Sequence, residues 1–509
     1  MVDDVLIVGA GPTGLVLALW LDAQGVRVRI IDKNTAPSEE SRALAVHART
    51  LELYRQLGLA EEVAHAGLQN PTMNLWAGGK HKARLALGVA GAQLTPYPFI
   101  LTYPQDQHER LLTLRLEERG VRVERHTELL GFEEQGDHIT ARLRLHDGSE
   151  TNHDARYLAG CDGARSMARR QIGASFEGGT YKQLFYVADV EVSGMASAGE
   201  AHIALDSSDF VALLPYARGG YRLIGVVRGE HAERAETLTF DDVSHVALEG
   251  LRAKIDKVNW FSTYNVHHRV TDRFRRGRVF LLGDAAHVHS PVGGQGMNTG
   301  IADAVNLAWK LAAVLHEKAP DALLDSYALE RQAFAHQLVA TTDRVFTFVT
   351  SEGKLANFVR TRIAPLLVNL AGKLDAPREL LFRTVSQTAL NYRDSPLSCG
   401  TAGKVQGGDR LPWVATKSGD NYAPLRSIGW QAHVYGEPRA ALTAWCAAHH
   451  LPLQVFAFEA AHHAAGLAQN AVYLLRPDTY VALADAAGTP AALSAYLADR
   501  GLSLEAAEG

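Results

Sequence analysis

The sequence predicts an α/β protein of several domains, and three observations lead to that fold class. The chain has 509 residues, too many for one hydrophobic core, so its length favours about two to four domains. Near the N-terminus, apolar runs that end in glycine-rich turns lead into helical stretches, the arrangement of a parallel sheet covered by helices. The central span 185–265 has instead the pattern of antiparallel strands joined by turns.

The first element is a strand followed by a glycine-rich turn and a helix. The strand is Val5–Val8, the turn is Gly9-Ala10-Gly11-Pro12-Thr13-Gly14, and the helix is Leu15–Gln24. Gly9 permits the tight turn, Gly11 lets the backbone approach a pyrophosphate, and Gly14 lets the helix pack on the strand. The helix N-terminus adds N–H groups and the positive end of its dipole. This pattern predicts the phosphate-binding turn of a dinucleotide.

The next strand ends in an acidic residue at the position expected for a ribose contact. Val26–Ile31 is followed by Asp32, about 18 residues after Gly14, which is near the spacing of the acid that accepts a hydrogen bond from a ribose hydroxyl. Strand, turn, helix, second strand and acid together favour a Rossmann-like domain over a glycine-rich turn without a ligand. They do not separate NAD from FAD.

Two later segments bear on that choice. Ser41-Arg42-Ala43 opens a stretch predicted to be helical through Tyr54, in which Arg42 either reaches the cofactor phosphates or is a solvated helix arginine. The apolar strand that begins at Tyr157 ends in a small-residue turn with Asp162-Gly163, followed by Arg165. An Asp-Gly pair at a strand end is often only a turn.

A third segment is the most informative. The apolar strand 278–282 delivers Gly283-Asp284, and the glycine-rich loop of residues 291–300 then leads into the amphipathic helix Ile301–Leu315. Asp284 suits a ribityl hydroxyl. The loop brings backbone N–H groups and a helix N-terminus to one place, which suits the negative charge at N1 and C2=O of a reduced flavin.

These motifs, in this order, resemble the single-component FAD-dependent aromatic hydroxylases, the group A flavoprotein monooxygenases of the para-hydroxybenzoate hydroxylase fold. The resemblance covers residues 1 to about 350. Pro104-Gln105 with the helix from Glu109, and Leu324–Tyr327 with Glu330-Arg331, also match the family. The sequence departs from it at Asp32, where glutamate is more usual, and at Cys161, where alanine is common.

The resemblance implies the activity and the cofactors. NADPH or NADH would reduce FAD. Lys33 does not decide which of the two is the reductant. Oxygen would then reach a phenolic or polycyclic aromatic substrate through a flavin C4a-hydroperoxide. The residues expected to bind FAD are Gly9, Gly11, Pro12, Thr13, Gly14, Asp32, Lys33, Arg42, Gln105, Asp162, Gly163, Gly283, Asp284, Pro291, Gly294, Gln295, Gly296, Met297 and Asn298.

The catalytic residues implied are positional. His287, His289 and Pro291 are expected beside the isoalloxazine. Either histidine is a candidate to relay a phenolic proton, because imidazole titrates near neutral pH, and the alternative is that both only satisfy local backbone hydrogen bonds.

The resemblance also implies three domains. Residues 1–180 and 266–390 would form the FAD-binding domain, 181–265 with part of 71–103 an inserted antiparallel substrate sheet, and 391–509 a thioredoxin-like domain. Gly407, Trp430 and the segment around Arg476 suggest the last of these. Since Cys446 has no CxxC partner, a structural or dimerising role is expected there.

The predicted substrate sheet contains a hairpin whose strands flank residues 217–220. No arginine lies within Phe210–Pro215 to clamp a small carboxylate, which favours a larger, less charged aromatic substrate. An ordinary sheet that packs on its own core explains the same pattern without a ligand. The expected substrate contacts are Phe210, Leu213, Pro215 and Gly293.

Composition limits the other partners. The net charge is -5 and no basic block is present, which argues against nucleic acid. Cys161, Cys399 and Cys446 have no metal-site spacing, so no metal is expected and a reducing compartment, the cytoplasm, is favoured.

The apolar runs also bear on location. The N-terminal run is broken by glycines and follows acids, unlike a secretory signal, and no stretch is long enough to span a bilayer. Leu355–Leu374 is amphipathic, favouring packing on a neighbouring domain over a membrane-surface or dimer contact, and a homodimer stays open.

Three alternatives to aromatic hydroxylation remain. The same oxygenating intermediate supports Baeyer–Villiger oxidation or epoxidation, because the fold does not fix how it reacts. A non-catalytic protein that binds FAD or an aromatic ligand, and a plain NAD dehydrogenase, are the others. A flavin-dependent halogenase is disfavoured, since no Trp-x-Trp-x-Ile-Pro segment is found.

Overall fold

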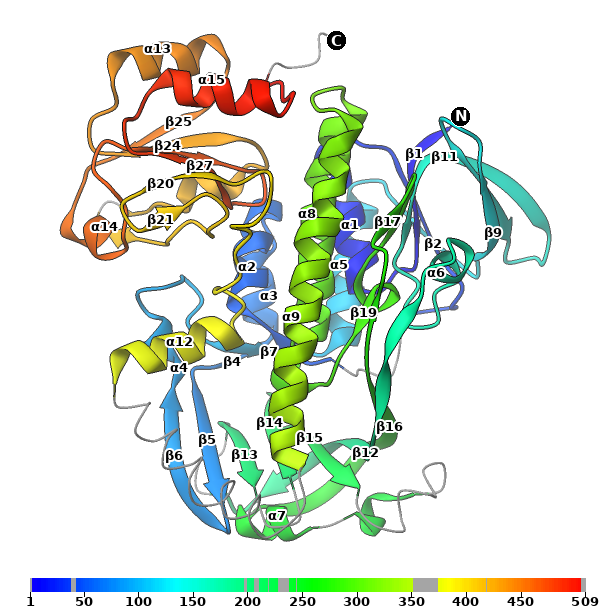
Figure 1. Ribbon diagram of the computed structural model, residues 1–509. Helices are drawn as coiled ribbons and strands as arrows, with labels where there is room; N and C mark the ends of the chain where they lie inside the picture. The colour runs from blue at the N-terminus through cyan, green and yellow to red at the C-terminus, as the bar shows by residue number, and fades with distance from the viewer. Residues whose placement is uncertain are drawn as a thin grey trace.

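The computed structural model describes residues 2–37, 43–195, 199–205, 210–217, 219–227, 238–243, 245–350, 374–417 and 419–504. Arg42 and residues 355–373 of the amphipathic stretch therefore lie outside the described residues. Three larger sheets organise the molecule. Figure 1 shows one of them at the right with the N-terminus, one at the bottom, and one at the upper left with the C-terminal helices.

The first sheet has the parallel core predicted from the N-terminal motif. Its strand order is β17 (Arg275–Arg276), β18 (Val279–Leu281), β11 (Glu150–Gly160), β1 (Asp3–Val8), β2 (Val28–Asp32) and β8 (Val123–Arg125), with β9 (Glu128–Glu134) and β10 (Ile139–Arg144) extending β11. From β18 to β8 neighbouring strands are parallel. The carboxyl ends of β1, β11 and β18 therefore meet at one edge, where open parallel sheets bind ligands.

Helices cover this sheet. They are α1 (Pro12–Asp22), α2 (Ala48–Tyr54), α3 (Ala60–Ala66), α5 (Gln105–Glu118), α6 (Met167–Gln171), α8 (Gly296–Leu315) and α9 (Asp325–Thr350). Residues 14–21 of α1 are all buried, because α1 lies between the sheet and the helices α5 and α8. A helix apolar on every side belongs in such an interior position.

Two predicted helix boundaries are wrong. Helix α8 begins at Gly296 and not at Ile301, so the second half of the predicted glycine loop is the first turn of the helix. The helix predicted from Ser41 begins only at Ala48. Ala45–Val46 forms strand β3, which pairs with β7 (Ile100–Thr102), and that long-range pairing overrides the local helical pattern.

The second sheet contains the predicted antiparallel hairpin. Its order is β19 (His287–Val288), β16 (Lys254–Thr271), β12 (Phe176–Ser193), β15 (Gly220–Val227), β14 (Phe210–Ala217), β13 (Ala201–Leu205), β5 (Thr72–Ala77) and β6 (Lys80–Ala86). Strands β14 and β15 form the hairpin. The described strands within the span 181–265 belong to this sheet, but β12 begins before it and β16 ends after it. The end of β16 pairs with β19, which lies in the segment between Gly283 and Pro291.

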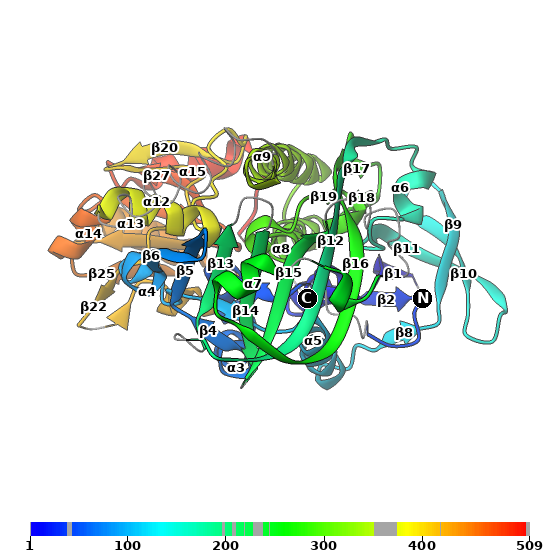
Figure 2. The same ribbon diagram turned by 90° about the horizontal axis from the view of Figure 1, so that it is seen from below.

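The two faces of this sheet have different surroundings. Helix α7 (Val246–Gly250) covers one face, with a core that includes Val211, Leu213 and Leu223. The opposite face carries Phe185, Val226 and Val266 with the partly exposed Phe210, Ile224 and Tyr264. In Figure 2, seen from below, α7 lies in front of the sheet while α8 lies behind it. The second face is therefore turned toward the helices of the first domain.

The C-terminal sheet is mixed. Its order is β21 (Val405–Gln406), β20 (Cys399–Ala402), β27 (Val481–Asp485), β26 (Val472–Leu475), β24 (Gln431–Tyr435) and β25 (Leu453–Phe456), with helices α13 (Ala440–Ala448), α14 (Ala460–Ala464) and α15 (Pro490–Asp499). All three cysteines of the chain are free thiols. Cys446 is buried in α13, and burial raises the pKa of its thiol to about 11, so it stays protonated.

Buried charges join this domain to the first one. Arg476 donates to both carboxylate oxygens of Glu330, at 2.7 and 3.0 Å, and to the carboxylate of Asp478. Lys310 donates to Glu330 at 2.8 Å. All four side chains are at most 2% exposed. Removal of one partner of such a group would leave a buried charge uncompensated, at a cost of about 3–5 kcal/mol. Because Arg476 and Glu330 come from different domains, their pairing holds the two domains together.

The remaining elements complete the chain. They are β4 (Leu68–Asn70), α4 (Leu87–Gly91), α12 (Asp375–Val385), β22 (Ala415–Thr416) and β23 (Gly419–Asp420), besides short 3-10 turns. Among the described residues, no helix is long and apolar enough to cross a bilayer.

Candidate functional site

The predicted cofactor motifs meet at the carboxyl edge of the first sheet. The Gly9 N–H donates to the Ile31 carbonyl at 2.8 Å, and the Cys161 N–H donates to the Val8 carbonyl at 2.8 Å. The Leu282 N–H donates to the Gly160 carbonyl at 3.0 Å. The turns that carry Gly9, Asp162 and Gly283 are thus fixed side by side, although they come from distant parts of the sequence.

The three glycines of the N-terminal turn differ in the space beside them. Gly9 has φ +106°, and a Cβ there would lie 2.2 Å from the Cys161 carbonyl oxygen. A Cβ on Gly14 would lie 2.0 Å from the Gly9 carbonyl oxygen, so both positions exclude any side chain. A Cβ on Gly11 would meet no atom within 4 Å. Gly11 therefore faces open space, as a backbone approached by a pyrophosphate must.

The N-termini of α1 and α8 converge on a threonine. The Thr13 Oγ1 would lie 2.7 Å from a Cβ on Gly283 and 2.3 Å from one on Gly300. The missing side chains at Gly283 and Gly300 make room for Thr13, and α1 and α8 pack closely. Two helix N-termini with unpaired N–H groups at one place favour a bound anion.

Asp32 lies at the end of β2 as predicted, with its carboxylate in contact with the glycine turn. It accepts hydrogen bonds from the Ala10 N–H at 2.7 Å and the Asn34 N–H at 2.8 Å, and the Arg125 guanidinium lies 3.7 Å away. An ionised carboxylate has about four acceptor sites, so room for a ribose hydroxyl remains. Lys33, the next residue, is exposed.

The two other predicted acidic contacts differ in their partners. One oxygen of Asp162, Oδ2, accepts from the N–H groups of Met167 and Ala168 at 2.6 and 3.2 Å. Its other oxygen, Oδ1, is buried and has no hydrogen-bond partner among the described residues. Asp284 is exposed on the turn after β18. A buried acceptor without a donor is costly, so Asp162 fits a site completed by a ligand hydroxyl.

The glycine loop before α8 is held by side chains from β3 and α2. Asn298 accepts from the His47 N–H and the Thr50 hydroxyl, at 2.9 and 2.8 Å, and donates to the carbonyls of Ala45 and Gly294, at 2.8 and 3.0 Å. Its amide is fully used within the protein. The Asn298 side chain, which is 0% exposed, therefore supports the loop and has no hydrogen-bonding group left for a ligand.

His47, which the motif analysis missed, also holds this loop. Its Nε2–H donates to the Gly294 carbonyl at 3.1 Å, and burial lowers its pKa to about 4, so the ring is neutral. Gly293, between Pro291 and Gly294, has φ +78° and is exposed. Pro291, Gly296 and Met297 are partly exposed, whereas Gln295 is buried. His47 and Asn298 thus hold the loop in place, and the loop exposes its backbone at Gly293.

The two predicted catalytic histidines have different surroundings. His287 is 2% exposed, and its Nε2 lies 2.7 Å from the carboxylate of Asp303. His289 donates from Nδ1 to the Ser290 carbonyl at 2.8 Å, and its Nε2 is buried with no partner among the described residues. Burial, with His287 nearby, lowers the pKa of His289 to about 4. His289 is therefore a neutral acceptor, whereas His287 is already bonded within the protein.

Asp303 organises the turn that carries Asp284, and the motif analysis missed it. Its Oδ2 accepts from the Gly283 N–H at 2.9 Å and from His287, and its Oδ1 accepts from Arg331 at 2.6 Å. Burial alone would raise the pKa of Asp303, but Arg331 and His287 hold it below its ordinary value. The sequence does contain a signal for this role, because Asp303 is a carboxylate within the apolar face of the helix predicted from Ile301.

Gln105 starts helix α5 near the site. Its Oε1 accepts from the Ala43 N–H at 3.2 Å and its Nε2 donates to Glu109 at 2.8 Å. Gln105 thereby holds the segment that leads into β3. Gly163, with φ +75°, meets nothing within 4 Å of a Cβ, so it is open to a ligand.

The predicted substrate residues do not share one face of the second sheet. Phe210 lies on the face turned toward the first domain. Leu213 is fully buried on the α7 face, because residues an odd number apart in a strand point to opposite sides. Pro215 shares the strand parity of Leu213, and its carbonyl accepts from the Thr102 hydroxyl at 2.5 Å. Of these three, only Phe210 lies on the face turned toward the first domain.

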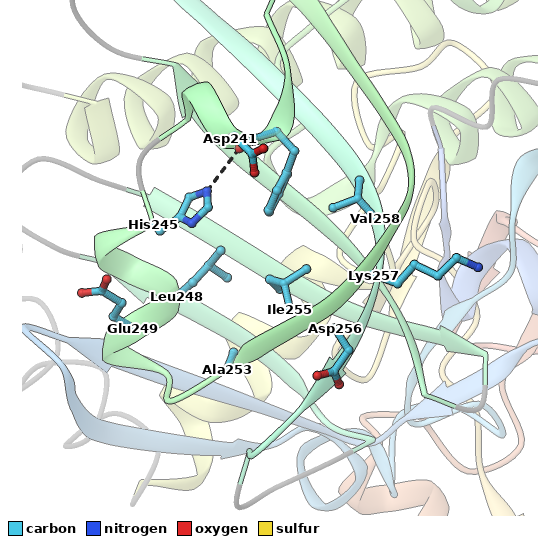
Figure 3. Close-up of a pocket in the computed structure, with 10 residues that line it drawn as sticks. Asp241, His245, Leu248, Glu249, Ala253, Ile255, Asp256, Lys257 and Val258 are labelled. Atoms are coloured by element: carbon cyan, nitrogen blue, oxygen red, sulfur yellow. Dashed lines mark hydrogen bonds between the residues drawn. The ribbon is translucent and has the colours of Figure 1, made fainter.

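A cavity of about 340 Å³ lies elsewhere, on the α7 side of the second sheet (Figure 3). Its wall includes Leu248 from α7, His245 directly before that helix, and Ile255 and Lys257 from β16. The His245 ring lies 3.1 Å from the Phe240 carbonyl. None of the predicted cofactor residues lines it. It is separate from the convergent turns.

Residues 3–342 match the family model described as FAD binding domain. The chain belongs to this family. It is 36% identical over 413 residues to the 6-methylpretetramide 4-monooxygenase of Streptomyces rimosus, covering 79% of this chain and 72% of that protein. It is 33% identical over 427 residues to the pentachlorophenol 4-monooxygenase of Sphingobium chlorophenolicum, covering 80% of this chain and 75% of that protein.

Solved structures give the same result for the whole chain. The anhydrotetracycline hydroxylase of Streptomyces rimosus superposes with a TM-score of 0.77 at 27% identity and covers 98% of both chains. Aklavinone-11 hydroxylase, solved with FAD and aklavinone, has a TM-score of 0.77 at 26% identity and covers 98% of this chain and 99% of that one. The family resemblance and the fold class predicted from the sequence are confirmed, and the protein is a FAD-dependent monooxygenase.

The residues at the convergent turns fit FAD. Gly11 is open where a pyrophosphate needs backbone, Asp162 has a buried acceptor that needs a donor, and Asp284 is exposed where a ribityl hydroxyl would be held. The roles of these residues as cofactor contacts remain predictions.

Two alanine substitutions separate support of the turn from contact with FAD. We expect Gly14→Ala to lower the thermal midpoint of the apoprotein, because its Cβ overlaps the Gly9 carbonyl and overpacking costs about 1–3 kcal/mol. We expect Gly11→Ala, with φ -76° and open space, to leave that midpoint unchanged and to weaken FAD binding at least tenfold, about 1.4 kcal/mol. Calorimetry of the apoprotein and fluorescence titration with FAD measure both. Equal FAD affinity of Gly11→Ala and the parent chain would contradict the predicted contact.

Proposed function

We propose that this monooxygenase hydroxylates a phenolic, polycyclic aromatic substrate, using NAD(P)H and O₂. The observation that carries the proposal is the apolar, aromatic face of the second sheet, turned toward the first domain and continuous through β19 with the loop at Pro291. The named relatives act on tetracyclic, phenolic and related compounds, which supports the same substrate class here.

The partly exposed side chains of this face suit a large planar ligand. Phe210, Ile224 and Tyr264 lie together on it, with Phe185 behind them. Aromatic and aliphatic walls with few polar groups are typical of sites for such ligands. In the domain division proposed from the sequence, residues 181–265 with part of 71–103 form the substrate domain, and this sheet contains their strands.

One arginine on this face, Arg222, is not available as a carboxylate clamp. Arg222 is 2% exposed and donates to both oxygens of Asp189, at 2.8 and 2.7 Å. Its charge is thereby neutralised by a bidentate partner. This supports a substrate without a small carboxylate group at that end.

FAD supplies the oxygen-transfer chemistry when bound. The residues of this chain would bind FAD, orient the aromatic substrate and exclude water from the site. The sheet face would hold the ring system, Pro291 and Gly293 would lie beside the flavin, and the N–H groups at the start of α8 would stabilise negative charge on it. Phe210 and its neighbours would exclude water from the site.

Among the two histidines, His289 is the proposed polar contact. Its Nε2 accepts a hydrogen bond from a phenol or from the flavin, while Nδ1 is held by the Ser290 carbonyl. With a pKa of about 4, the ring orients a donor and does not keep its proton. His287 supports the Asp284 turn through Asp303.

The other assignments complete the proposal. The C-terminal domain has a structural role, with its free thiols unused in catalysis. The cytoplasm is the proposed compartment, because free cysteines suit a reducing environment. A homodimer stays part of the hypothesis, to be settled by mass in solution.

The proposed reaction is tested with phenols and polycyclic aromatics offered to the FAD-loaded enzyme. We expect substrate-stimulated NAD(P)H oxidation, oxygen uptake and a product heavier by one oxygen atom that derives from labelled O₂. A labelled lactone would show Baeyer–Villiger oxidation, and a labelled epoxide would show epoxidation. Either product would contradict hydroxylation. A preparation that binds FAD but shows no stimulation by any aromatic would contradict the function.

Replacement of His289 tests its polar contact. We expect His289→Phe to lower kcat about tenfold, the effect of one lost hydrogen bond in a dry site, and His289→Gln to restore most of it. Because burial lowers the pKa of His289 to about 4, the dependence on this residue should be constant from pH 6 to 8 and disappear as pH falls through 4. FAD affinity serves as the control. Identical kcat values for the Phe and Gln variants would rule out the contact.

Two apolar residues of β14 form a matched pair. We expect Phe210→Ala to raise KM at least tenfold while the thermal midpoint changes little, because Phe210 is partly exposed toward the site. We expect Leu213→Ala to cost about 2–5 kcal/mol of stability with KM unchanged, because Leu213 is fully buried behind the sheet. Steady-state kinetics and calorimetry distinguish the two. The reverse pattern would mean that the α7 face is the one that meets the substrate.

A further inference from the structure

Arg331, a buried arginine of α9, connects three segments of the chain. Its Nε donates to the Asp303 carboxylate at 2.6 Å, its Nη1 to the Tyr392 hydroxyl at 2.8 Å, and its Nη2 to the Thr299 carbonyl at 3.2 Å. The side chain is 0% exposed. A planar guanidinium with all three nitrogens bonded fixes the relative positions of its partners.

Two of these contacts lead to the FAD site. Asp303, besides binding Arg331, accepts from the N–H of Gly283 and from His287, so it holds both sides of the turn that carries Asp284. Thr299 lies in the first turn of α8, directly after the loop that faces the flavin. Arg331 therefore links the turn after β18 to the start of α8.

The third contact leads to the C-terminal domain. Tyr392 lies in the segment before β20, and its ring packs on Tyr480 with centroids 4.5 Å apart. The guanidinium of Arg476 lies 5.2 Å from the Tyr392 ring and is itself bound to Glu330, the neighbour of Arg331. The position of the Tyr392 hydroxyl is thus set by contacts of its ring with Tyr480 and Arg476, which belong to the C-terminal domain.

We propose that Arg331 is a positioning residue for FAD, which sets the Gly283–Asp284 turn and the first turn of α8, and that Tyr392 makes this geometry depend on the C-terminal domain. The proposal rests on FAD binding by the family and not on the substrate class. The C-terminal domain then contributes to cofactor affinity without touching the cofactor.

A purely structural role predicts a different result. A residue that only stabilises the fold changes the thermal midpoint of the apoprotein, and FAD affinity follows only that loss. A positioning residue changes FAD affinity beyond the effect of an equal stability loss elsewhere. The distinction needs a matched loss of stability at a remote site.

Tyr496 supplies that matched control. It is also a buried tyrosine of the C-terminal domain, and its hydroxyl donates to the Leu397 carbonyl at 2.7 Å. Tyr392→Phe and Tyr496→Phe each remove one buried hydroxyl and keep the ring, but only the first removes a partner of Arg331. We expect similar falls in the thermal midpoint of the two apoproteins.

FAD titration of the two variants decides between the roles. We expect Tyr392→Phe to raise the Kd of FAD about fivefold to tenfold, with a shifted visible flavin spectrum, and Tyr496→Phe to change the Kd less than twofold, as the loss of one buried hydrogen bond at Arg331 requires. Equal Kd values and spectra for the two variants would overturn the proposal. Neither measurement uses an aromatic substrate, so failure here is separate from failure of hydroxylation.

A double-mutant cycle gives a second test. Arg331→Lys keeps the charge but cannot make the three directed hydrogen bonds. If Tyr392 acts through Arg331, then adding Tyr392→Phe to Arg331→Lys raises the Kd of FAD by less than twofold further. A full additional fivefold increase in the double variant would show that Tyr392 acts by another route, contrary to the proposal.

Discussion

Asp303 carries a negative charge where water does not reach, and the arrangement of the cofactor site depends on how that charge is compensated. Arg331 supplies the opposite charge, and His287 and the Gly283 N–H supply further donors. A buried carboxylate is costly unless it is paired with an opposite charge and its oxygens accept hydrogen bonds. The compensation therefore fixes the turn after β18, the strand β19 and the position of α9 at once.

Close backbone approach is the second constraint, and it acts on the same residues. Gly9 and Gly14 leave no room for a side chain against neighbouring carbonyls, and Gly283 and Gly300 make room for Thr13. The carboxyl ends of the strands and the N-termini of α1 and α8 can then share one small volume. The dipole ends of two helices meet there, which suits an anionic cofactor.

The C-terminal domain is joined to this apparatus by buried charges, of which Arg476 and Glu330 pair across the boundary between the two domains. Glu330 and Lys310 come from the first domain, and Arg476 and Asp478 from the last. On the other flank, Arg410 donates to both oxygens of Glu52, at 2.8 and 2.5 Å. The C-terminal domain, whose cysteines are free thiols, thus contacts the first domain through buried ion pairs.

The sequence by itself determined the fold class, the family, the glycine turns and the β14–β15 hairpin, because these depend on local backbone geometry and on short-range apolar patterns. Strand alternation also separates Phe210 from Leu213, but it does not tell which face meets the flavin. The start of α8, the occupation of the Asn298 amide and the pairing of His287 with Asp303 were decided only by the tertiary structure. Each of these depends on which distant residue supplies a hydrogen bond or a charge, and a single sequence carries no direct signal for such a pairing.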